Sequence, residues 1–206
     1  MEPISITGFR RTSFSHGRSV PLFVILFLCG LTVNSSSAAT ITWTGAVSSN
    51  WNNATNWTPQ QVPTSADTAV INSGTVVATN AQFSALTFNG GTLSGVVSVR
   101  SNCVMNWNNG VLAPNGSLTV ESNGVVNLQT SDAKYLDGPM VNSGTVVWTG
   151  GTLNVRNNNS GYLGSVVNLG LWQMQGDLVL DHWFDTGLER FINGGTFRKV
   201  IGSGIS

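Results

Sequence analysis

The densest group of side chains that could do chemistry lies in the stretch DHWFDTGLE. Asp181, His182, Asp185 and Glu189 place three carboxylates around one imidazole. Such a set could hold a metal ion, or supply a general acid and a general base. Its spacing matches no metal motif, and a polar, solvated loop explains the same residues. We therefore keep Asp181, His182 and Asp185 as a candidate polar loop site and assign no catalytic, cofactor-binding or metal-binding residue.

A second group is aromatic. Trp43, Trp51 and Trp57 lie close together among Asn, Thr and Ser residues. Exposed tryptophan rings could form a platform for sugar rings, so these three residues are candidate carbohydrate contacts. The alternative is a plug at one end of a repeat fold, since an uncovered end would expose apolar core and unpaired strand edges. We favour the plug and define residues 40–71 as a Trp-rich capping module, with strands expected near residues 41–44 and 68–71.

The elements that must position these groups are short strands. In Val141–Val155 apolar and polar residues alternate on both sides of a Gly-Gly corner, with Val146 and Trp148 on one face before it and Leu153 and Val155 on one face after it. Alternation with a period of two marks half-buried strands. Related corners of Asn, Gly and Thr followed by an apolar residue recur along the chain, at 72–77, 89–93, 115–118, 123–126, 142–147, 150–153 and 193–197.

The spacing of these strands indicates a stacked repeat. Successive apolar segments open 21 to 25 residues apart, at Val97, Leu118, Val141, Val166 and Phe191. That interval suits one coil of three short strands. We predict an all-β fold, a right-handed parallel β-helix over residues 72–206, in which outward Thr and Asn side chains form ladders. Two inserts, 130–140 and 181–189, are expected to be loops.

An antiparallel β-sandwich is the alternative fold. Its best support is Asn123–Gly124, a hairpin-type signal between two alternating runs. We favour the β-helix because corners of one chemical type recur along the whole chain.

The beginning of the chain predicts export. Basic residues up to Arg18 are followed by an apolar run, Pro21–Val33, and by small residues up to Ala39. This is the layout of a secretory signal peptide, which we assign to residues 1–39. The apolar run is shorter than the roughly 20 residues that cross a bilayer. The remaining chain has six basic and eight acidic residues, a net charge of −2, which argues against a nucleic-acid partner.

Two parts of the sequence resemble a known family. One is Trp43-Thr44-Gly45, Asn50-Trp51, Asn56-Trp57 and Asp67–Ile71, and the other is Asn193–Lys199 followed by Gly202-Ser203-Gly204. They resemble the opening module and the repeats of exported bacterial proteins of the autotransporter-associated β-strand repeat type. The resemblance covers essentially all of the chain after residue 39 and implies an adhesin-like parallel β-helix. Because more coils normally follow such a repeat, we expect an N-terminal piece of a longer protein, with membrane contact only through a region beyond Ser206.

Together these features predict a secreted, non-enzymatic repeat protein of the cell surface or extracellular space, adhesin-like or structural, without a cofactor. Glycans or surface proteins are the expected partners. The alternatives are a polysaccharide-active β-helix enzyme, a lyase or hydrolase, and a carbohydrate-binding module that uses the tryptophans. Such enzymes need carboxylates, or a Lys or Arg with an Asp, gathered in a groove, and outside the 181–189 loop the acidic residues are scattered.

Overall fold

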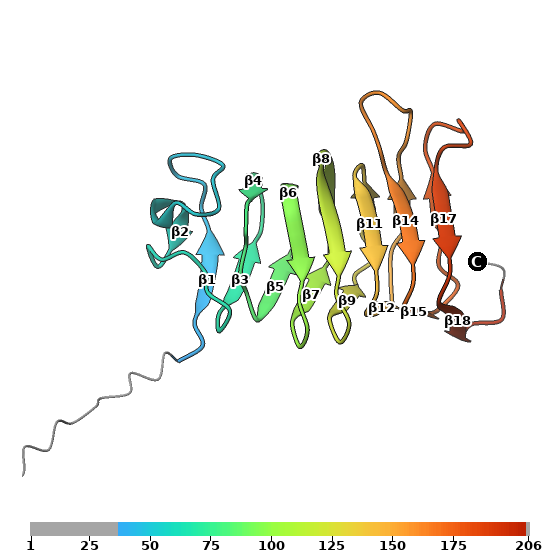
Figure 1. Cartoon of the computed structure of the whole chain (residues 1–206), viewed down its shortest axis with the longest axis horizontal. Helices are drawn as coiled ribbons and strands as arrows, with labels where there is room; N and C mark the ends of the chain where they lie inside the picture. The colour runs from blue at the N-terminus through green and yellow to red at the C-terminus, as the bar shows by residue number, and fades with distance from the viewer. Residues whose placement is uncertain (1–36, 205–206) are drawn as a thin grey trace, which may run out of the picture. The chain divides into compact units, whose positions relative to one another are not determined.

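The computed structural model describes residues 37–204, so the predicted signal peptide lies almost wholly outside the described residues. The described chain forms a parallel β-solenoid of about six coils, which confirms the predicted parallel β-helix (Figure 1). Within these residues one helical turn is found, η1 (Ala54–Asn56), and no helix is long and apolar enough to cross a membrane. Among the strands of the described residues one pair is antiparallel, β1 (Thr40–Trp43) with β2 (Trp57–Thr58).

The first face of the solenoid has one short strand from each coil. Each strand pairs in parallel with its counterpart one coil later, so that Thr68, Ala85, Val104, Val125 and Thr145 occupy equivalent positions. After β1 the strands of this face are β3 (Thr68–Ile71), β5 (Ala85–Phe88), β7 (Val104–Trp107), β9 (Val125–Leu128), β12 (Thr145–Trp148), β15 (Leu171–Gln175) and β18 (Thr196–Ile201).

The other two faces share a second sheet that divides at two long strands, β6 (Thr92–Val99) and β8 (Gly110–Val120). The beginning of β8 pairs with one set of strands and its end with another. The second face contains β4 (Thr75–Ala78), β10 (Lys134–Leu136), β13 (Leu153–Val155) and β16 (Leu180–His182). The third face contains β11 (Pro139–Asn142), β14 (Ser165–Asn168) and β17 (Arg190–Asn193).

The core consists of columns of inward side chains, one from each coil. On the first face one column contains Phe88, Trp107, Leu128, Trp148 and Met174, all at most 2% exposed. The inward positions predicted for β12 and β13 are confirmed, because all four side chains are buried. Burial of apolar surface between coils is the main favourable contribution to the stack.

The Asn123–Gly124 corner does not form the hairpin on which the β-sandwich alternative depended. Asn123 has a positive φ of 63°, as a tight turn requires. The strands on its two sides, β8 and β9, are not partners: β9 pairs in parallel with β7 and β12. The turn therefore leads the chain from one face to the next, and turn chemistry alone does not distinguish a solenoid corner from a hairpin.

Asparagine side chains form ladders between coils. At the first corner, the amide of Asn89 donates to Asn72 and the amide of Asn108 donates to Asn89, at 2.8 and 2.7 Å. On the outward side of the first-face strands the amide of Asn127 likewise donates to Asn106 at 2.8 Å, so the expected outward asparagine ladder is confirmed there.

Another ladder, not predicted from the sequence, joins the ends of the third-face strands: Asn142 donates to Asn168 at 2.7 Å, and Asn168 to Asn193 at 2.6 Å. Asn142 and Asn168 are fully buried, whereas Asn193 in the last described coil is exposed.

Residues 130–140, expected to be a loop insert, instead supply two strands of the stack, β10 and β11. The prediction was wrong because Lys134 and Asp137 have polar side chains that nevertheless occupy buried positions. Lys134 lies in register with the inward Leu153 of the next coil. Its aliphatic stem therefore takes the place of an apolar core residue.

The buried ammonium of Lys134 is surrounded by backbone carbonyl groups. It donates to the carbonyl oxygens of Gln129, Thr130, Asp132 and Gly150, the last three at 3.2, 2.9 and 3.1 Å. Burial lowers the pKa of Lys134 to about 8, and the charge of Asp132 opposes this shift. At neutral pH the side chain is still protonated and closes the turn between the first and second faces.

Gly91 tests the close approach of successive coils. It has a φ of +89°, and a Cβ placed there would lie 2.3 Å from the carbonyl oxygen of Gly74 in the preceding coil. We expect Gly91→Ala to lower the free energy of unfolding by about 1–3 kcal/mol, measured by urea denaturation. Gly161→Ala is the matched control, because no atom lies within 4 Å of a Cβ at that loop position. Equal stability of the two variants would contradict the close stacking.

Lys134→Met tests the carbonyl cage. Methionine keeps the apolar stem but removes the donor, so we expect a loss of about 3 kcal/mol from the unpaired carbonyl groups. The matched control is Lys199→Met, which removes a more exposed lysine paired with Asp177 and should change the urea midpoint little. A Lys134→Met protein as stable as the control would show that the hydrogen bonds from Lys134 to the carbonyl groups do not contribute to the free energy of unfolding.

Candidate functional site on the outer corner of the last coils

The three N-terminal tryptophans are buried and present no exposed ring for a sugar. Trp51 and Trp57 are each 1% exposed and Trp43 is 6% exposed. The ring of Trp57 packs edge-on against both others, with centroid distances of 4.9 Å to Trp43 and 4.7 Å to Trp51. Its indole N–H donates to the carbonyl of Trp51 at 2.7 Å. The proposed carbohydrate contact at these residues therefore has no accessible surface in this structure.

The segment around these tryptophans covers the first edge of the stack. β1 pairs with the free side of β3, and Asn50 forms a bridge with Val77 of β4. The backbone N–H of Trp51 donates to the carbonyl of Val77 at 3.1 Å, and the N–H of Val77 donates to Ser49. Covered in this way, the edges of β3 and β4 cannot pair with another chain.

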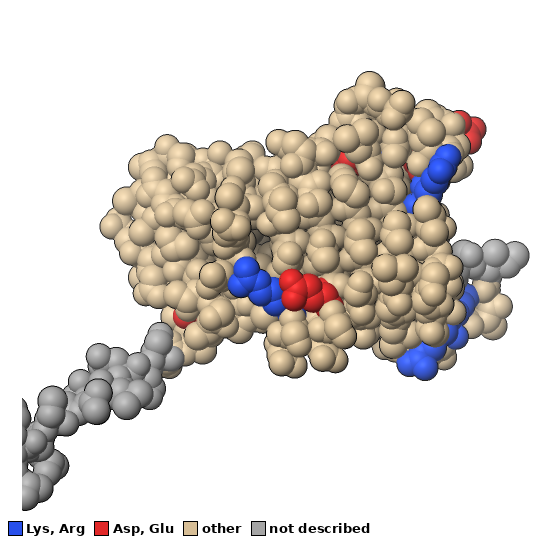
Figure 2. All heavy atoms as spheres, viewed as in Figure 1, with Lys and Arg blue, Asp and Glu red and all other residues tan. Residues whose placement is uncertain are grey.

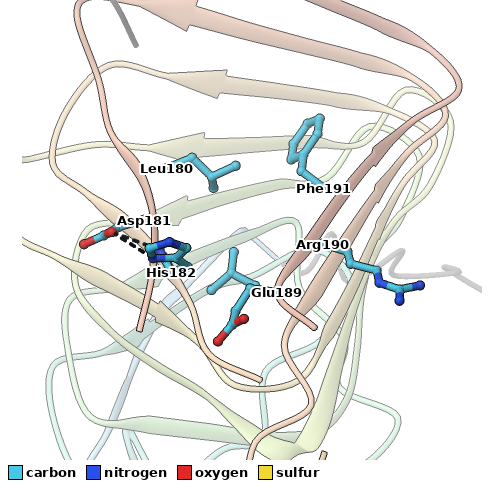
Figure 3. A pocket seen from close by; sticks show the side chains of 7 residues that line it. Leu180, Asp181, His182, Glu189, Arg190 and Phe191 are labelled. Atoms are coloured by element: carbon cyan, nitrogen blue, oxygen red, sulfur yellow. Dashed lines mark hydrogen bonds and ion pairs between the residues drawn. The ribbon is translucent and has the colours of Figure 1, made fainter. Parts of the chain in front are cut away.

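The polar loop site begins on the last strand of the second face. In β16, Leu180 lies in register with Leu153, Asp181 with Asn154 and His182 with Val155. His182 therefore occupies an inward position of the register, and Asp181 occupies an outward one. Together with Glu189 and Arg190 they border an open hollow (Figure 3). Figure 3 shows the Asp181 carboxylate beside the His182 ring, whereas the guanidinium of Arg190 points away from them.

His182 is held between two carboxylates. Its Nδ1 lies 3.8 Å from Oδ1 of Asp181, and its Nε2 lies 3.6 Å from Oδ1 of Asp185. A hydrogen bond to its own backbone and the charges of Asp185, Asp181 and Glu189 raise the pKa of His182, although desolvation opposes them. The structure therefore brings the three predicted polar residues together, and the neighbouring carboxylates contribute to the raised pKa of the ring.

Glu189 has a different role, since it orders the loop. Its carboxylate accepts a hydrogen bond from the backbone N–H of Phe184 at 3.1 Å and one from the Thr186 hydroxyl at 2.9 Å. Desolvation pushes its pKa upward, but these hydrogen bonds and others from the backbone outweigh it and lower the pKa. Within residues 37–204, no group of three or more His, Cys, Asp or Glu side chains is arranged to hold a metal ion.

The aromatic side of this site, which surrounds Arg156, was not predicted from the sequence. The Arg156 guanidinium forms a bidentate ion pair with Asp137, with distances of 2.6 and 2.7 Å. It also lies over three aromatic rings, 4.6 Å from the centroid of Tyr135, 5.0 Å from that of Tyr162 and 5.8 Å from that of Trp183. We call Tyr135, Arg156, Tyr162, Trp183 and Phe184 the outer aromatic cluster.

This cluster joins three successive coils. Tyr135 belongs to β10, Arg156 and Tyr162 to the loop after β13, and Trp183 and Phe184 to the loop after β16. Tyr162 packs on Phe184 at 5.0 Å, and Thr186 donates to the carbonyl of Asn157 at 2.7 Å. One signal was visible in the sequence: both tyrosines of the chain belong to this cluster. Their spacing alone could not show that they meet.

Comparison with protein-family models, curated proteins and solved structures finds no match. The class of protein therefore follows from the fold itself, a parallel β-solenoid with an aromatic and acidic corner on its last described coils. The resemblance to autotransporter-associated repeats stays a prediction.

The raised pKa of His182 gives a pH test. We expect the ring to titrate above the usual value of about 6.5, measured from its NMR signals. Protonation favours the folded loop, so this contribution is complete below the unfolded-state pKa and is lost as the pH rises through the folded-state pKa. Asp185→Asn should lower the pKa of His182, whereas Glu121→Gln, on a distant turn after β8, should leave it unchanged. An unaltered pKa in Asp185→Asn would refute the pairing.

Proposed function

We propose that this chain is an exported, non-enzymatic repeat protein of the cell surface or extracellular space, adhesin-like or structural in role. The observation that carries the proposal is the in-register parallel stack, which repeats its outward side chains from coil to coil. On the first face Thr87, Asn106, Asn127, Val147 and Gln173 occupy one outward column. Neighbouring coils are about 4.8 Å apart, so this column is a dense row of mostly uncharged groups.

The charge distribution supports the same role. Figure 2 shows a face on which uncharged side chains predominate, with one small group of mixed charge near the middle and further charges toward the C-terminal side. An uncharged lattice suits contact with an extended, repetitive partner or use as a spacer, because like charges in register would repel one another. The Trp-rich opening and the Asn-Gly-Gly-Thr repeats, which resemble those of exported bacterial β-helix proteins, point the same way.

A polysaccharide-active enzyme is the second candidate, and the hollow beside Asp181, His182 and Glu189 favours it. A glycosidic bond is usually cleaved by a pair of carboxyl groups, one acting as acid and the other as base or nucleophile. Glu189 already accepts hydrogen bonds from Phe184 and Thr186, which leaves it less available as the second carboxyl group. We therefore rank this candidate below the non-enzymatic one.

Export is tested by producing the full sequence in a bacterial host. We expect the protein at the surface of intact cells or in the medium, and N-terminal sequencing should begin at Thr40. A control with Ala39→Leu should slow processing, because the small residue before the cleavage point is lost. Cytoplasmic protein that retains its first residues would contradict the proposal.

The enzymatic alternative is tested by assaying the purified protein for new reducing ends or unsaturated sugars on a panel of polysaccharides. We expect no turnover above that of the Asp181→Ala variant. Turnover that Asp181→Ala abolishes would replace the proposed function with the second candidate.

A further inference from the structure

The ring of Trp183 is a large apolar surface that the fold places in solvent. It is 56% exposed, whereas five of the other six tryptophans are at most 1% exposed and Trp43 is 6% exposed. Trp183 follows the outward Asp181 and the inward His182 on β16, and it packs against Tyr135, which is an outward residue. The exposed ring of Trp183 therefore lies on the outer surface of the solenoid and not in its core.

The ring is also held in place. Tyr135 meets it edge-on, with a centroid distance of 6.2 Å and an interplanar angle of 74°. The Arg156 guanidinium lies 5.8 Å from its centroid. Arg156 is itself fixed by the bidentate pair with Asp137, whose side chain is only 4% exposed. A ring fixed before a ligand arrives loses little conformational entropy on binding.

The charge around the ring limits what it can bind. Asp137 neutralises Arg156, so the cluster presents no free cation to a ligand. Asp181 and Asp185, which lie on either side of Trp183 in the sequence, have side chains that are 50% and 92% exposed. Even when His182 between them is protonated, the two carboxylates leave a net negative charge, which would repel a phosphate, sulfate or uronate group. An entirely apolar ligand would desolvate them without compensation.

A neutral pyranose sugar satisfies both demands. One face of its ring consists of C–H groups, which can lie against an indole, and its edge carries hydroxyl groups, which donate to carboxylates. We propose that the outer aromatic cluster binds neutral sugar residues of a glycan, with Trp183 as the stacking surface and Asp181 and Asp185 as hydroxyl acceptors. This inference rests on the proposed function for its biological setting and names the class of partner that such a surface protein would meet.

The cluster also assigns distinct roles to its members. Trp183 would touch the sugar directly. Arg156 is a positioning residue for the Trp183 ring, because its guanidinium lies over the rings of Tyr135, Tyr162 and Trp183. Arg156→Lys keeps the charge opposite Asp137 but loses the planar group that stacks on the rings. It should therefore weaken binding and shift the Trp183 indole NMR signal even without ligand.

The experiment titrates the purified protein with neutral hexasaccharides of glucose and of mannose and with charged hexasaccharides of galacturonate and of heparin. Calorimetry and the indole N–H signal of Trp183 report binding. We expect at least one neutral sugar to bind, Trp183→Ala to weaken it at least about tenfold, and Trp183→Phe to retain part of the affinity. Leu169→Ala is the matched control, because Leu169 is also 56% exposed but lies in another turn; it should bind like the parent protein.

Three results would overturn the inference: no neutral sugar bound at up to roughly 10 mM, equal affinity in Trp183→Ala, or binding of the charged sugars alone. Because the titration uses purified protein, it is independent of the export test. Exported protein that binds no neutral sugar would leave the proposed function standing without this site, and sugar binding by protein that is not exported would do the reverse.

Discussion

Parallel backbone pairing between successive coils is the interaction on which the rest of the structure depends. Most strands of the solenoid have three or four residues, too few to be stable alone, and they become stable by pairing with their counterparts in neighbouring coils. The pairing also fixes the register, which brings inward side chains into columns and asparagines into ladders. It further explains the crowded corners, since a backbone that passes close to the preceding turn leaves Gly91 no room for a side chain.

The same register determines where side chains distant in the sequence can meet. Two loops that leave the stack after the same face in consecutive coils must lie next to each other, as the loops after β13 and β16 do. The outer aromatic cluster depends on this rule, because Tyr135, Arg156 and Trp183 come from three consecutive coils. The solenoid thus builds a composite surface from segments that are simple by themselves.

How much the sequence could reveal differs between the interior and this surface. Alternation is a local signal, and it predicted the inward Val146, Trp148 and Leu153 together with the strand Thr68–Ile71. At Lys134 the alternation predicts a loop, because a charged side chain at an inward position interrupts the apolar pattern. In the structure its ammonium donates hydrogen bonds to carbonyl groups and is buried. The partners of Arg156 depend on the exact number of residues in each coil, which differs between coils: the spacing is 17 for Asn72 and Asn89 but 27 for Leu153 and Leu180. No short window of sequence contains that information.

Lys134 also affects how the protein would tolerate its surroundings. A cluster of inward-facing carbonyl oxygens is the kind of environment in which many proteins hold a dissolved cation, whose occupancy then follows its concentration outside. In this chain the positive charge is covalently attached to the strand that it serves. This charge can be neither diluted away nor removed by a chelator, so we expect the turn to stay closed in fresh water and in brine alike.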